Sequence, residues 1–152
     1  MVGESGDDLQ ARRQGRGGHR AVPHTADVRV EAWGTSREQC LAEAVLGLVE
    51  SFADLSRAGP GALRRVRVAR DSDEDVLAAL LEEVVFRLEV HGEVPVEAEA
   101  RTVEDGAVEA RLAVTDLSAV PVTGAAPKAV SWHGLRMGPD PYGWSCAATV
   151  DV

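Results

Sequence analysis

The stretch PHTADVRVEAWG, residues 23–34, decides the first strand of the predicted fold and contains its most informative carboxylate. From Ala26 onward apolar side chains alternate with polar ones, and this period of two is typical of a half-buried β-strand. Asp27 stands at the beginning of that strand, on the face opposite the apolar side chains. A carboxylate in that place needs either solvent or a partner.

A helix is predicted directly after this strand. Gly34 ends the strand, and two overlapping capping boxes follow it, Thr35 with Glu38 or Ser36 with Gln39. Apolar residues then recur at helical spacing and form one stripe: Leu41, Val45, Leu48 and Phe52. The change from a period of two to helical spacing therefore predicts a strand followed at once by a helix.

The rest of the chain predicts one more strand and helix, and then strands alone. Residues 63–70 alternate as a short strand, and the acids of residues 71–75 suit the beginning of a helix, because they complement its dipole and its free N–H groups. A calcium loop is the alternative for this acidic run, but the run lacks the Gly and the distal Glu of such a loop. Two hairpins end the chain, one turning at residues 104–106 and the other at residues 138–141.

The predicted order is β-α-β-α-β-β-β-β, which indicates an α+β two-layer sandwich with two helices packed on a largely antiparallel or mixed sheet. The chain has 152 residues, of which 45% are hydrophobic, enough to bury one core and too few to need two domains. Residues 1–18 mix Gly with charges of both signs and carry almost no large apolar side chains, so they predict a flexible tail. We therefore expect one domain over residues 19–152.

Composition limits the classes of partner. The formal net charge is −9, and nucleic-acid affinity depends largely on Lys and Arg that neutralise phosphates, so tight direct binding to RNA or DNA is not expected. The sequence contains neither a run of eighteen apolar residues nor the apolar core of a secretory signal. We therefore expect a cytoplasmic protein that does not bind membranes.

The two ends of the predicted sheet bring carboxylates together. Asp27 begins the first strand and Asp151 nearly ends the last one, both opposite the apolar alternation. Antiparallel neighbours place the start of one strand beside the end of the other. The terminal carboxylate of Val152 would add a third oxygen donor, and such a set suits calcium or magnesium. Strand ends that are simply charged and solvated are the alternative.

Three motifs together resemble the archease family. They are His24-Thr25-Ala26-Asp27-Val28, then Lys128-Ala129-Val130-Ser131-Trp132-His133-Gly134-Leu135, and finally Asp151-Val152. The similarity covers residues 20–152 in the order and with the separations of that family. It implies a protein cofactor, not an enzyme. Archeases activate the RtcB-type RNA ligase, promote guanylylation of its active-site histidine and allow multiple turnover in tRNA splicing and RNA repair.

The resemblance also implies a site. Asp27, Asp151 and Val152 correspond to the family's metal ligands, and the metal is expected to be calcium, with magnesium or manganese as alternatives. Lys128, which is the only lysine of the sequence, corresponds to the lysine implicated in activating the ligase. His24 is a candidate for contact with the partner, with packing at the strand edge as the alternative. His133 is expected to pack on its strand and not to bind the metal.

Two other functions stay open from the sequence. The first is a chaperone or adaptor that needs no metal, a role also proposed for archeases. The second is a metal-dependent phosphoesterase, which is disfavoured because the sequence shows no His-x-His, HExxH or paired-acid signature. For the ligase activator itself, the metal could either favour one ligase conformation or be delivered for nucleotidyl transfer.

Overall fold

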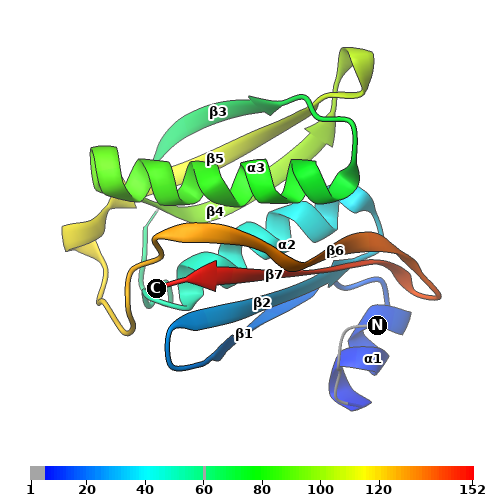
Figure 1. Ribbon diagram of the computed structural model, residues 1–152, viewed down its shortest axis with the longest axis horizontal. Coiled ribbons are helices and arrows are strands. Elements are labelled where there is room, and N and C mark those ends of the chain that lie inside the picture. The colour runs from blue at the N-terminus through cyan, green and yellow to red at the C-terminus, as the bar shows by residue number, and fades with distance from the viewer. Residues whose placement is uncertain (1–5, 60) are drawn as a thin grey trace.

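The structure is a computed structural model that describes residues 6–59 and 61–152. Its strands form two antiparallel sheets (Figure 1). The four-stranded sheet has the order β1 (Gly18–Pro23), β2 (Asp27–Gly34), β7 (Gly143–Asp151) and β6 (Ala129–Asp140). The three-stranded sheet has the order β3 (Ala62–Val68), β5 (Val108–Asp116) and β4 (Glu93–Thr102).

Two long helices connect the strands, and side chains cap both at their beginnings. In α2 (Arg37–Glu50) the hydroxyl of Ser36 accepts a hydrogen bond from the backbone N–H of Gln39. In α3 (Asp73–Phe86) the hydroxyl of Ser72 does the same for Asp75. A π-helical turn at Arg87–His91 extends α3 and ends at Gly92, whose φ of 63° is left-handed. The structure thus selects Ser36 from the two predicted caps of the first helix.

The helices contact both sheets and close one core. α2 packs against β1, β2 and β7 of one sheet and β4 of the other, while α3 packs mainly against β6. The apolar stripe predicted for the first helix is buried, with Leu41, Val45, Leu48 and Phe52 at most 1% exposed. Apolar residues of β2 and β7 face the same core, as their alternation predicts: Val28, Val30, Ala32, Cys146, Ala148 and Val150.

The α+β class is confirmed, but the strands divide into two sheets where the sequence predicted one. Both hairpins are also confirmed, because β4 pairs with β5 and β6 pairs with β7, but the second one turns at residues 141–142 and not at 138–141. Strand β1 and two short 3-10 turns, Glu104–Gly106 and Leu117–Ala119, were not predicted. Within the described ranges, no helix has both the length and the apolar character needed to cross a membrane.

The prediction of a flexible tail over residues 1–18 is corrected for its described part. Residues 1–5 lie outside the described residues, whereas Gly6–Arg13 form a helix, α1, and Gly18 begins β1. Arg12 holds α1 in place, since its side chain is only 2% exposed and its Nη2 lies 2.8 Å from Asp140. That partner is 128 residues away in the sequence, so local composition could not show it.

The outer face of β2 is also more covered than its alternation predicted. Glu31 and Trp33 lie on the polar side of the pattern, yet they are 9% and 3% exposed. The guanidinium of Arg20 on β1 lies 5.2 Å from the ring of Trp33, and its Nε is 3.1 Å from Glu31. The side chain of Arg20 therefore covers the half of the face that carries Glu31 and Trp33, whereas Asp27 and Arg29 in the other half are only half-buried.

Candidate functional site

The predicted meeting of the first and last strands is present. β2 and β7 are antiparallel neighbours, and Asp27 is directly opposite Asp151 in their register. Side chains of directly opposite residues lie on the same face of a sheet, with Cβ atoms about 5 Å apart. The two carboxylates therefore stand side by side at one end of the sheet.

Backbone hydrogen bonds tie the other motif residues to this end. The amide of Lys128 donates to the carbonyl of Asp151 at 2.7 Å, and the amide of Val152 donates to the carbonyl of Ala26 at 3.2 Å. The β1–β2 turn is closed by a bond of 2.8 Å from the amide of His24 to the carbonyl of Asp27. In Figure 1 the C-terminus lies beside this turn and the beginning of β6. We call Asp27, Lys128, Asp151 and Val152 the carboxylate tip.

The charged side chains of the carboxylate tip are open to partners. Asp27 is half-buried, whereas Asp151 and Lys128 are exposed. Within residues 6–59 and 61–152, none of these three side chains forms an ion pair. An ammonium and two carboxylates without internal partners leave their charge available for a ligand or for another protein.

The donor set of the tip suits a divalent cation only if the chain supplies a third oxygen. Two adjacent carboxylates are hard ligands of the kind that calcium and magnesium prefer. In the described part of the chain, however, no group of three His, Cys, Asp or Glu side chains is placed to hold a metal ion. The sequence predicts that Val152 supplies the third oxygen, and the structure holds this residue beside the β1–β2 turn through the bond from its amide to the carbonyl of Ala26.

Strand β6 leaves its partner over four residues beside the carboxylate tip. Ser131 pairs with Thr149 and Arg136 pairs with Ala147, so residues 132–135 form an arch opposite a single position of β7. Gly134 takes a φ of 73° at the top of this arch, a conformation that favours glycine. His133 is therefore exposed and does not pack on its strand, contrary to the prediction.

The arch and the β1–β2 turn border an open pocket of about 530 Å³. We call it the arch pocket, and its polar lining residues are His24, Thr25, Asp27, Arg29, His133 and Thr149. The sequence predicted roles for His24 and Asp27 but missed Arg29 and Thr149. The signal for those two was present, because they share the face of Asp27 and Asp151 at the next position of each alternation.

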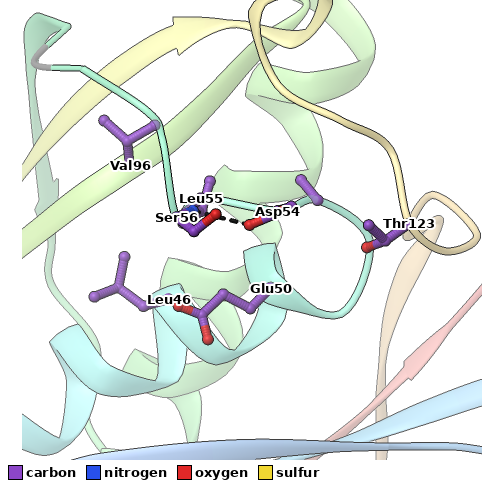
Figure 2. Close-up of a pocket in the computed structure, with 8 residues that line it drawn as sticks. Leu46, Glu50, Asp54, Leu55, Ser56, Val96 and Thr123 are labelled. Carbon is purple, nitrogen blue, oxygen red and sulfur yellow. Dashed lines mark hydrogen bonds between the residues drawn. The ribbon is translucent and has the colours of Figure 1, made fainter.

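A second pocket, of about 540 Å³, lies at the C-terminal end of α2 and is drawn in Figure 2. Glu50 extends from the helix, and Asp54 on the following loop accepts a hydrogen bond from the amide of Ser56 at 2.9 Å. This bond and one from the Ser56 hydroxyl hold the pKa of Asp54 below its ordinary value. None of the residues that line this pocket belongs to the three motifs.

A third, apolar hollow of about 280 Å³ reaches the carboxylate tip through Lys128. Its walls are mostly apolar side chains from the segment just after α2, the π-helical turn, the 3-10 turn Leu117–Ala119 and the segment before β6: Phe52, Leu88, Leu117, Val122 and Pro127. Val122 is 61% exposed. The surface beside Lys128 thus combines a positive charge with exposed apolar atoms.

Comparison of the sequence with known families and proteins identifies relatives of this chain. A profile of the Archease protein family matches residues 19–152. The chain belongs to the archease family. A protein of Mycobacterium tuberculosis named "Probable protein archease" is 50% identical over 135 residues, which cover 89% of this chain and 75% of that protein. "Protein archease" of Thermococcus gammatolerans is 31% identical over 69 residues, which cover 45% of this chain and 49% of that protein.

Solved archease structures have the same fold. The solution structure of Protein 1598 of Methanobacterium thermoautotrophicum has a TM-score of 0.71 at 18% identity, covering 89% of this chain and 99% of that one. The crystal structure of a Thermotoga maritima archease, described as a possible chaperone, has a TM-score of 0.60 at 20% identity. That match covers 86% of this chain and 94% of the other. These names describe no catalytic reaction, and the structures support the fold alone.

Proposed function

We propose that this protein activates an RtcB-type RNA ligase in the cytoplasm and catalyses nothing alone. It would promote guanylylation of the ligase's active-site histidine and so allow multiple turnover in tRNA splicing and RNA repair. Membership of the archease family supports the proposal. The observation that carries it is the pairing of Asp27 with Asp151, together with the bond from the Lys128 amide to Asp151. Three motifs far apart in the sequence thereby form one accessible end of the molecule.

We further propose that the carboxylate tip holds a divalent cation, with calcium preferred and magnesium or manganese as alternatives. The side chains of Asp27 and Asp151 and the carboxylate of Val152 would hold it. A bound cation would supply positive charge that neutralises phosphate oxygens during nucleotidyl transfer. The residues themselves present the acidic end of a protein with a net charge of −9 to a basic nucleotide cleft.

The simplest mechanism is selection of one ligase conformation. If the carboxylate tip binds the guanylylation-competent form more tightly than the resting form, the population shifts toward competence. A tenfold shift requires a difference of about 1.4 kcal/mol in binding free energy between the two forms. One charged hydrogen bond from Lys128 to the ligase, made in only one form, is of that size.

The central experiment measures covalent ligase guanylylate. An RtcB-type ligase is incubated with GTP and a divalent metal, with and without this protein. We expect the wild type to raise the yield, and Asp27→Asn to lose that effect while its urea unfolding curve stays that of the wild type. Asp71→Asn makes the same change of charge at an exposed residue outside the carboxylate tip and should stimulate normally. Normal stimulation by Asp27→Asn would contradict the role of this carboxylate.

Metal binding and the role of Lys128 need separate measurements. Calcium titrations should show binding to the wild type and to Asp71→Asn, and none to Asp151→Asn. Lys128→Gln should keep calcium binding but lose stimulation, because its ammonium is proposed to contact the ligase and not the metal. Loss of calcium binding in Lys128→Gln would contradict this division of roles.

A metal-independent chaperone is the second candidate function, favoured by the name of the Thermotoga maritima relative and by exposed apolar side chains. Val122 and Trp132 are 61% and 65% exposed. Suppression of client aggregation by Asp151→Ala as well as by the wild type would favour this function. Hydrolysis of a generic phosphoester, abolished by a chelator, would instead favour a phosphoesterase.

A further inference from the structure

The arch pocket gathers hydrogen-bond donors that the carboxylate tip does not use. Arg29 lies directly opposite Thr149 in the β2–β7 register, and Ser131 pairs with Thr149 from the other side. The arch then brings His133 to the same hollow, and the β1–β2 turn adds His24 and the hydroxyl of Thr25. One guanidinium, two imidazoles and two hydroxyls therefore surround one open space.

Arg29 is the anchor of this set. The only contact of its guanidinium with a carboxylate in the described chain is a distant one, from Nε to Glu31 at 3.8 Å. Its side chain is 37% exposed, so the two terminal nitrogens of the fork can reach a ligand in the pocket. A planar guanidinium whose two terminal nitrogens are available is well suited to bind phosphate through two parallel hydrogen bonds.

The arch has the backbone shape that this arrangement requires. A Cβ atom at Gly134 would lie 3.4 Å from Nη1 of Arg29 and 3.8 Å from Oγ1 of Thr149. The backbone of the arch therefore passes close to both groups. Any residue other than glycine would be strained at position 134, because its φ of 73° is left-handed. The amide of His133 is tied back by a bond of 3.1 Å to the hydroxyl of Ser131.

An exposed aromatic residue belongs to the same arch as His133. Trp132 precedes His133 in the arch and is 65% exposed, whereas Trp33 is 3% exposed and Trp144 is half-buried. Exposing most of an indole to water is unfavourable unless a ligand or a partner covers it. Nucleotide bases stack on such rings, because every base has a flat π-face.

We propose that the arch pocket binds a nucleotide, with its phosphates on Arg29, His133 and Thr149 and its base on Trp132. The overall charge of −9 does not oppose a site of this size, because the donors are local and the pocket holds one carboxylate, Asp27, on its wall. The residues proposed to bind the nucleotide are not the proposed metal ligands, although Asp27 lies on the wall of the pocket, and nucleotide binding requires no ligase. Failure of ligase activation would therefore leave it standing.

Calorimetric titration of the full chain tests the proposal. The probes are GTP and inorganic triphosphate, both in EDTA so that no cation on Asp27 can bridge to phosphate. We expect both to bind and Arg29→Gln to weaken both at least about tenfold, since a hydrogen bond to a charged group contributes roughly 1.5–3 kcal/mol. Arg29→Lys should recover part of the loss. Arg67→Gln, at an exposed arginine of the other sheet, removes the same charge and should bind normally.

Trp132→Ala separates the base from the phosphates. It should weaken GTP at least about fivefold, as loss of one stacked base implies, and leave inorganic triphosphate unchanged. GTP should also quench the fluorescence of the wild type more than triphosphate does. Circular dichroism and urea unfolding of each variant distinguish lost binding from lost folding.

Several results would overturn the proposal. They are the absence of heat with both probes, equal losses in Arg29→Gln and Arg67→Gln, and binding of a 3′-phosphorylated oligonucleotide but of neither probe. Equal weakening of GTP and triphosphate by Trp132→Ala would overturn the assignment of the base to the indole.

Discussion

Replacing Arg12 with alanine should destabilise the whole domain, although Arg12 lies in a terminal helix. Its Nη2 is 2.8 Å from Asp140 and 3.0 Å from the carbonyl of Trp144, and the two charged side chains are 2% and 9% exposed. Removing one partner of a buried ion pair costs about 3–5 kcal/mol. Because release of α1 would return Asp140 to water, we expect the lower end of this range, a loss of about 3 kcal/mol in the free energy of unfolding.

The pH dependence of this loss identifies its cause. Burial raises the pKa of Asp140, but hydrogen bonds from Arg12 and from the Tyr142 amide outweigh it and hold the pKa below its ordinary value. A carboxylate with a lowered folded pKa stabilises the protein above its unfolded pKa of about 3.9, and this contribution disappears as pH falls through the folded pKa. The difference between wild type and Arg12→Ala should therefore shrink below about pH 4.

Urea unfolding at neutral and acidic pH is the assay, with Arg13→Ala as the matched control. Arg13 is exposed, and within the described part of the chain its guanidinium interacts only with the Tyr142 ring, at 5.9 Å, so its loss should cost under about 1 kcal/mol. Hydrogen exchange of α1 amides should accelerate in Arg12→Ala. A neutral-pH difference below about 0.5 kcal/mol between wild type and Arg12→Ala would refute the docking of α1 by this pair.

Two further predictions concern β1 and the β6–β7 hairpin. Burial lowers the pKa of His19, but the hydrogen bonds that its ring donates to Glu43 and Glu50 outweigh burial and raise the pKa above its ordinary value. The stabilisation is therefore complete below an unfolded pKa of about 6.5 and is lost as pH rises through the folded pKa, so His19→Gln should cost about 1 kcal/mol near pH 6 and less near pH 9. Equal costs in urea at both pH values would contradict this. Gly143→Ala should cost more than about 2 kcal/mol, because φ is 133° and the new Cβ would meet a backbone oxygen at 2.3 Å, whereas Gly138→Ala meets open space and should stay within about 0.5 kcal/mol. Similar melting temperatures for both glycine variants would show that the hairpin can relax.

Much of the fold was predictable because its signals are local. The alternation from Ala26 and the cap at Ser36 depend on neighbours within a few residues, and both agree with the structure. The pairing of Asp27 with Asp151 followed from two alternations and the geometry of antiparallel strands. The division into two sheets was missed, because alternation shows that a strand is half-buried and not which strand lies beside it.

The candidate site was predictable only in part, for the same reason. Motifs located Asp27, Lys128 and Asp151, but the sequence of the arch continues the pattern of a strand, so its separation from β7 was not visible. Arg29 becomes a candidate ligand-binding residue only because the folded arch places Gly134 close to its guanidinium.

By itself, the sequence determined the local elements, the α+β class and the residues that meet at the carboxylate tip, because periodicity and capping act over a few neighbouring residues. Only the tertiary structure decided that α1 docks through Arg12 and that the arch brings His133 to the pocket of Arg29. Those features depend on contacts between segments more than one hundred residues apart, whose side chains meet only once the sheets have formed.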